Sequence, residues 1–101
     1  MIGREFRFHD GKKGAALAVR IIKNSKEDMI RKVLKDGTVV VHLKGNPEDP
    51  KGLLIRYLSN ELHMDRGRFD IIEIKDGVDV LLSILDIVPN EIQKMILDKI
   101  A

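Results

Sequence analysis

The sequence predicts an α+β fold, a two-layer sandwich in which one mixed or antiparallel sheet carries two helices on one face. Three observations predict it. Several short runs alternate apolar and polar residues, as half-buried strands do. Two longer runs place apolar residues three and four apart, the helical spacing. Asp-Gly pairs at 10–11, 36–37 and 76–77 separate apolar runs, as turns between strands do. We expect a β-β-α-β-β-α core with an additional N-terminal strand, forming one domain over residues 1–101.

The strands are predicted from their alternation. Residues 4–9 read REFRFH, with Phe6 and Phe8 on one face of a short N-terminal strand. Residues 15–22 and 37–44 form the next two predicted strands, which we expect to be antiparallel neighbours. Residues 68–74 and 79–87 are expected to form a hairpin around Asp76-Gly77.

Three segments carry helix signals. Residues 24–34, NSKEDMIRKVL, predict a short helix capped by Asn24 or Ser25. Residues 50–64 predict a longer helix, with Asp49 as its cap and Pro50 in the first turn, where the missing N–H is harmless. Residues 89–100 predict the last helix, beginning at a proline.

Composition excludes several classes of chemistry. The chain has no cysteine, so disulfides, thiolate metal sites and thiol catalysis are excluded, and a reducing cytoplasm is the expected location. The three histidines do not have metal-ligand spacing, and we expect no metal and no cofactor. The charged N-terminal decapeptide is not expected to be a secretory signal, nor is a membrane span expected.

Charge suggests one binding site. Residues 1–56 hold thirteen Lys or Arg against seven Asp or Glu, whereas residues 57–101 hold five against nine. Lys51 lies near a predicted helix N-terminus, which favours anions. Together with Lys23, Lys26 and Lys44 it could hold a phosphate backbone. Glu48 and Asp49 in the same corner oppose this, so a solvated corner is the competing interpretation.

A catalytic alternative rests on His42. This histidine lies within the predicted strand 37–44 and could act as a base beside an acid such as Glu73. Glu73 belongs to the predicted hairpin around Asp76-Gly77. This hairpin also carries the carboxylates of Asp70, Asp76 and Asp79. Solvated charges at a strand edge, which also discourage pairing between sheet edges, explain this acidic group better. No nucleophile elbow and no glycine-rich phosphate loop is present, so no residue is assigned a catalytic role.

The order of motifs resembles a known family. The segment IIKNSKEDMI, then DGTVVVHL, a proline-containing corner and a helix with Leu54, Ile55, Tyr57 and Leu58 are similar to the YggU-like family, domain of unknown function 167. The resemblance covers about residues 6–100 and implies a β-β-α-β-β-α domain without an assigned biochemical role. Two polar motifs of that family are largely missing, because the corner reads NPEDPKGLL and the third turn reads KDGVDV.

The leading functional hypothesis is a small, soluble, non-enzymatic domain that binds a macromolecule as a monomer. One alternative is weak nucleic-acid binding, of RNA in particular, through the four lysines. A second alternative is a small hydrolase or nucleotide-processing enzyme with His42 and the acidic hairpin as its site. The partner could be a nucleic acid or another protein, and no membrane partner is expected.

Overall fold

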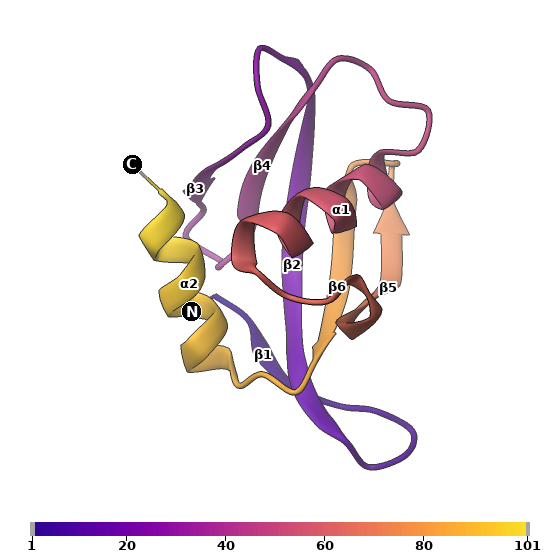
Figure 1. The fold of residues 1–101 in the computed structure, drawn as a ribbon, viewed down its shortest axis with the longest axis vertical. Helices are drawn as coiled ribbons and strands as arrows, with labels where there is room; N and C mark the ends of the chain where they lie inside the picture. Colours follow the sequence, from indigo (N-terminus) through magenta and orange to yellow (C-terminus); the bar gives the residue numbers. More distant parts are fainter. Residues whose placement is uncertain (1, 101) are drawn as a thin grey trace.

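Six strands and two α-helices make up the fold shown in Figure 1. The computed structural model describes residues 2–100. Along the chain the elements are β1 (Arg4–Arg7), β2 (Lys13–Ser25), β3 (Met29–Val33), β4 (Val39–Lys44), α1 (Pro50–Leu62), the 3-10 turn η1 (Arg66–Arg68), β5 (Phe69–Lys75), β6 (Asp79–Leu85) and α2 (Pro89–Lys99). The α+β class, the mixed sheet and the additional N-terminal strand are confirmed. Within residues 2–100, neither helix has the length and apolar character to cross a bilayer.

The long strand β2 organises the sheet. The order of the strands across the sheet is β3-β4-β2-β6-β5, and β1 pairs with β2 outside this path. The first part of β2 lies between two antiparallel neighbours, β1 and β6, with Gly14 opposite both Phe6 and Leu85. The later part pairs in parallel with β4, from Val19 opposite Val39 onward. One strand of 13 residues therefore supports both halves of the sheet.

The two faces of β2 differ in burial. Leu17, Val19 and Ile21 are at most 2% exposed, whereas Arg20 and Ile22 are exposed. Burying each of these three side chains stabilises the fold by about 1.5–3 kcal/mol. The buried residues of β2, α1 and α2 belong to one core cluster, and Figure 1 shows α1 in front of β2 and β6 and α2 beside β1. From the helices this cluster takes Leu54, Leu58, Leu62, Ile92 and Ile96.

Two of the three predicted helices, α1 and α2, begin where the sequence indicates. Asp49 caps α1, and its carboxylate accepts a hydrogen bond from the Gly52 N–H at 3.3 Å. Each helix has a proline in its first turn, where the absent N–H leaves no bond unmade. The chain start is also tied to α2, because the Ile2 N–H donates to Gln93 Oε1 at 3.1 Å. Ile2 is accordingly only 4% exposed.

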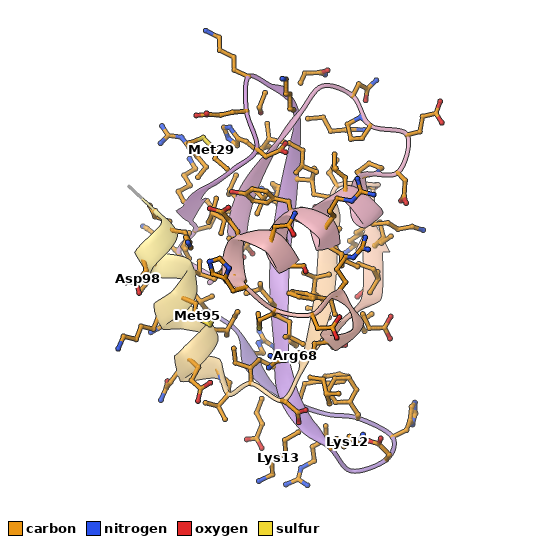
Figure 2. The ribbon with its side chains drawn as sticks, in the orientation of Figure 1. Lys12, Lys13, Met29, Arg68, Met95 and Asp98 are labelled. Carbon is orange, nitrogen blue, oxygen red and sulfur yellow. The ribbon has the colours of Figure 1, made fainter. Side chains whose placement is uncertain are left out.

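The junction between β6 and α2 is held by one arginine. Arg68 in η1, labelled in Figure 2, donates from Nε to the Leu85 carbonyl at 2.9 Å and from Nη2 to the Asp86 carbonyl at 2.8 Å. These carbonyls lie where β6 ends and the chain turns, so they lack sheet partners on that side. The sequence analysis did not assign this arginine a role.

The predicted helix over residues 24–34 is wrong, because this segment forms a turn and the edge strand β3. Asn24 belongs to β2, where it adopts a left-handed conformation with φ of 62° at a shift in the pairing with β4, so it does not cap a helix. Asp28 accepts a hydrogen bond from the Lys44 N–H at 2.7 Å, so its carboxylate joins this turn to the end of β4. Ile30 is 3% exposed between exposed or half-buried neighbours, the strand pattern.

The expected antiparallel pairing of the second and third predicted strands is also wrong. β2 and β4 are parallel, and β3 pairs antiparallel with the far edge of β4. The intervening strand explains the difference. β3 returns the chain along the sheet, so the next strand runs in the original direction and fits between β3 and β2. The hairpin of β5 and β6 around Asp76-Gly77 is confirmed.

Tyr57 gives a direct test of how α1 packs on the sheet. Partial burial raises the pKa of its phenol to about 12, and repulsion from Glu61 adds to the effect. Because the pKa is higher in the folded protein, Tyr57 stabilises the fold fully below pH 10, and this contribution is lost as the pH rises to about 12. Tyr57 is the single tyrosine and tryptophan is absent, so absorbance at alkaline pH reports it alone. We expect the titration of the Tyr57 phenol to have its midpoint near pH 12 in folded protein and near pH 10 in urea. A midpoint near pH 10 in the folded protein would contradict the partial burial of Tyr57.

Candidate functional site

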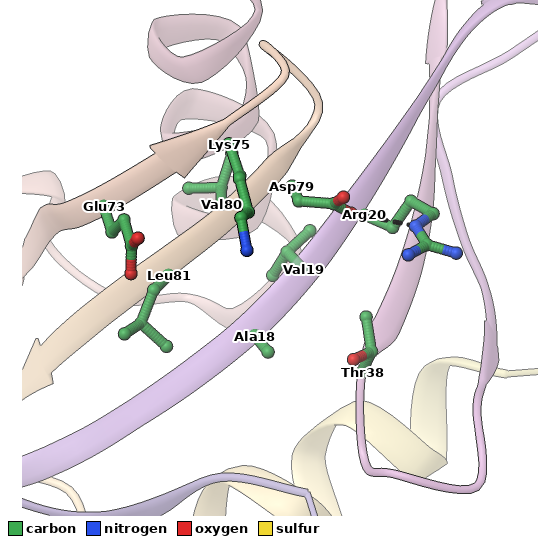
Figure 3. Close-up of a pocket in the computed structure, with 9 residues that line it drawn as sticks. All are labelled: Ala18, Val19, Arg20, Thr38, Glu73, Lys75, Asp79, Val80 and Leu81. Atoms are coloured by element: carbon green, nitrogen blue, oxygen red, sulfur yellow. Dashed lines mark hydrogen bonds and ion pairs between the residues drawn. The ribbon is translucent and has the colours of Figure 1, made fainter.

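The face of the sheet opposite the helices is the candidate site. Figure 3 shows it from outside, with Ala18, Arg20 and Leu81 toward the viewer and both helices behind the strands. Register places further side chains on the same face, because directly paired residues of neighbouring strands point to the same side. Arg4 lies opposite Ala16, and Ser83 opposite Asp70.

Three hollows on this face adjoin one another, and we call them together the groove. The distal hollow, of about 310 Å³, includes Ala18, Arg20, Leu81 and the rim of β5. The middle hollow, of about 360 Å³, shares Ala18 and Leu81 with it and adds Arg4. The aromatic hollow, of about 410 Å³, shares Phe6 with the middle hollow. The shared residues place the three hollows next to one another on this face of the sheet.

Two phenylalanines form one end of the groove. The rings of Phe6 and Phe8 meet edge to face, with centroids 4.8 Å apart. Phe8 packs over Gly14, where a Cβ would lie 2.7 Å from the Phe8 ring and collide with the Ile84 carbonyl. The absence of a side chain at Gly14 therefore lets the Phe8 ring pack closely on the sheet. The predicted common face of the two phenylalanines agrees with this contact.

An ion pair forms the other end. Arg20 Nε donates to Asp79 Oδ1 at 2.8 Å, drawn as a dashed line in Figure 3. This hydrogen bond and the charge of Asp79 raise the pKa of the Arg20 guanidinium above its ordinary value. Asp36 accepts a hydrogen bond from the Thr38 N–H at 2.9 Å, which lowers the pKa of its carboxyl. The carboxylate of Asp36 is therefore ionised at neutral pH.

Charges of both signs line the groove. Four cationic and five acidic residues line the groove, so the sum of their formal charges is slightly negative. The cations are Arg4, Arg7, Arg20 and Lys75, and the acids are Glu5, Asp36, Asp70, Glu73 and Asp79. His9 adds one imidazole at the aromatic end. Apolar side chains form the floor, chiefly alanines, leucine and the two phenyl rings.

The four predicted lysines lie outside the groove. The parallel pairing of β2 and β4 brings Lys23, Lys26 and Lys44 to the same end of the sheet, since Ser25 lies opposite Lys44. Lys51 follows in the first turn of α1. The acids in the same turns equal the lysines in number: they are Glu27, Asp28, Glu48 and Asp49. The sequence therefore gives this end of the sheet no excess of positive charge.

The N-terminus of α1 is already capped. The Asp49 carboxylate accepts the Gly52 N–H, one of the groups that an anion would need. The predicted anion site at Lys51 therefore competes with a negative side chain of the protein itself. The prediction that these lysines bind a ligand stays a prediction.

The structure does not bring His42 to the acidic hairpin. His42 lies on β4 and Glu73 on β5, and β2 and β6 lie between these strands. Three strand spacings amount to about 14 Å, too far for a proton transfer directly or through one water. His42 instead shares a hollow with Glu27 and Met29 at the β2–β3 turn. Among residues 2–100, no three His, Asp or Glu side chains converge as a metal site would require.

Sequence reasoning missed the groove, although one signal for it was present. The run AALAVR in β2 places alanines at alternate positions, so one face of this strand carries almost no side chain. Small residues on an uncovered strand leave space that neighbouring side chains border. The pairing of β1 and β4 along the same edge of β2 could not be derived from the sequence, and it supplies two of the walls.

Comparison with known proteins adds no assignment. The chain matches no family in a scan of protein families, and no curated protein resembles it closely enough to count as a relative. The resemblance to the YggU-like family therefore stays a prediction.

The close approach at Gly14 predicts a large effect of one methyl group. Gly14→Ala should destabilise the protein by about 1–3 kcal/mol, because the new Cβ meets a backbone carbonyl that cannot move freely. Urea unfolding measures the change. Gly67→Ala is the matched control, since nothing outside its neighbours lies closer than 3.7 Å to the added methyl. Equal stabilities of the two variants would contradict the packing of Phe8 on β2.

Proposed function

We propose that this protein binds another macromolecule, without catalysis, through the groove on the uncovered face of its sheet. The observation that carries the proposal is that three hollows lie next to one another across β1, β2, β6 and β5. Their length along β2, from Gly14 to Arg20, is about 20 Å at the rise of a strand. A site of this length suits a polymer better than a small metabolite, which is enclosed by a deeper cavity.

The composition of the groove supports non-covalent contact. An apolar floor surrounded by charged and polar side chains resembles the core and rim of protein interfaces. The floor is accessible: Ala18 and Leu81 are half-buried, and Ile72 at the aromatic end is 42% exposed. The short ion pair between Arg20 and Asp79 engages both side chains with each other.

Neither alternative gains comparable support. Nucleic-acid binding at the four lysines would require an excess of positive charge, and four acids in the same turns cancel it. An enzyme built on His42 and Glu73 would require these residues to meet, and two strands separate them. Both alternatives therefore rank below the groove.

The proposed domain acts as a monomer in the cytoplasm. Both ends of the sheet carry a strand with a β-bulge, at Ile30–Lys32 in β3 and at Ile71–Glu73 in β5. Bulges hinder the edge-to-edge pairing by which sheets associate. Exposed charged side chains on these strands also hinder such pairing; they are Arg31, Lys32 and Lys75. The absence of cysteine supports the cytoplasmic location.

Site-specific crosslinking tests the proposal. A photoreactive benzoylphenylalanine replaces Leu81 in the groove, and in a matched variant it replaces Leu97, which is 49% exposed on α2. We expect irradiated cells to give a discrete adduct with the Leu81 variant and none with the Leu97 variant. Digestion with protease or nuclease then identifies the class of macromolecule. No adduct at Leu81, or equal adducts at both positions, would reject binding through the groove.

A further inference from the structure

We infer that the aromatic hollow binds the guanidinium group of an arginine side chain that a polypeptide partner supplies. This inference rests on the proposed function and names the group of the partner that this end of the groove recognises. Three observations carry it: a buried hydroxyl without a hydrogen-bond partner, a carboxylate beside this hydroxyl that belongs to no ion pair, and two aromatic rings that line the same hollow.

Ser83 is the buried polar residue of the aromatic hollow. It is only 2% exposed, and its position opposite Ala16 of β2 directs its side chain to the uncovered face. Among residues 2–100, the serine hydroxyls that donate hydrogen bonds are those of Ser25 and Ser59. Every fully covered side-chain oxygen in this part of the chain has a partner, so the Ser83 Oγ must reach into the hollow. A ligand that fills this space must therefore offer the hydroxyl a hydrogen bond.

The carboxylate of Asp70 lies beside this hydroxyl. Asp70 and Ser83 are directly paired across β5 and β6, which places their Cβ atoms about 5 Å apart on one face of the sheet. Asp70 Oδ1 accepts the Ile71 N–H at 2.9 Å, and both carboxylate oxygens keep lone pairs for a ligand. Asp70 is exposed and, within residues 2–100, belongs to no ion pair. The hollow therefore offers a negative charge and a hydroxyl acceptor next to each other.

The nearest arginine in the sequence is directed away from this carboxylate. Arg7 lines the aromatic hollow, but it is paired with Lys13 and directly follows Phe6 in β1. Because side chains alternate along a strand, Arg7 is directed to the face of β1 opposite to Phe6. His9 adds an imidazole at the rim. Asp70 thus shares the face of the aromatic rings and gives this face of the hollow its negative charge.

The two phenyl rings favour a planar cation. Phe6 and Phe8 are half-buried and meet edge to face with centroids 4.8 Å apart, so part of their surface borders the hollow. A guanidinium group stacks on such a ring within about 6 Å of its centroid. Its N–H groups project in the plane of the group, in a fork that matches a carboxylate. One arginine can therefore stack on a phenyl ring while it donates to Asp70 and Ser83.

A nucleobase and a lysine ammonium fit these groups less well. A base also stacks and donates, but it brings phosphates toward a carboxylate in a groove whose formal charge is slightly negative. An ammonium is compact and strongly hydrated, and it lacks the planar fork that a guanidinium presents to a carboxylate. The guanidinium complements the charge, the flat rings and both hydrogen-bonding groups at once.

Small arginine derivatives test the hollow without a natural partner. The amide resonances of the isotope-labelled protein are followed by NMR while N-acetylarginine methylamide is added. Matched titrations use the citrulline derivative, which has nearly the same shape without the charge, and the lysine derivative. We expect saturable shifts at residues of the aromatic hollow for the arginine derivative, and about tenfold weaker binding of the other two.

Two variants assign this binding to the proposed groups. Asp70→Asn removes the charge from an exposed side chain, so the protein should fold, bind the arginine derivative about tenfold more weakly and lose its preference for arginine over citrulline. Ser83→Ala removes one hydroxyl and should weaken binding several-fold. Asp98→Asn on the exposed side of α2, labelled in Figure 2, is the matched control and should leave the affinity unchanged. The lost preference would not follow from a merely structural role of Asp70.

Three results would overturn the inference: shifts that do not saturate, equal affinities for the arginine and citrulline derivatives, or undiminished binding by Asp70→Asn. A short single-stranded oligouridylate provides a further arm. Displacement of the arginine derivative by this probe would place a nucleic acid in the hollow; the proposed function would then stand and the arginine inference would fall. An absent crosslink at Leu81 would instead reject the groove itself.

Discussion

The unequal coverage of β2 is the constraint on which the rest of the structure depends. Its odd-numbered residues Leu17, Val19 and Ile21 lie in the core beneath the helices, and its even-numbered residues Ala16, Ala18 and Arg20 lie on the uncovered face. Because side chains of a strand alternate, a shift of one residue in register would exchange the two faces. The hydrophobic core thus fixes the register of β2, and the register fixes the floor of the groove.

The neighbours of β2 turn this floor into a groove. β1 and β4 share one edge of β2, one along its start and the other from Val19 onward, so residues from the chain start and from the turn before β4 border the same hollow. β6 and β5 supply the opposite rim. The helices contribute the core that holds the strands in place, and the uncovered face remains available for contact.

Local signals determined which parts of the fold could be predicted. The starts of α1 and α2 were predicted correctly, because Asp49, Pro50 and Pro89 act within one helical turn. The turn at Asp76-Gly77 was predicted for the same reason. Residues 24–34 were assigned to a helix because Asn24 and Ser25 resemble caps, whereas both residues lie at the end of β2 and Asp28 accepts a hydrogen bond from the Lys44 N–H. The groove depends on pairings between distant strands, which no local pattern encodes.

Cysteine accessibility tests the one-sided sheet most directly, because the natural chain has no cysteine. Leu17→Cys and Ala18→Cys place a thiol on opposite faces of the same strand. In the folded protein, Ala18→Cys should react with a thiol reagent at a rate close to that of unfolded protein, whereas Leu17→Cys should react only as fast as the protein opens. Rapid reaction at both positions, or protection at both, would contradict a sheet covered on one side.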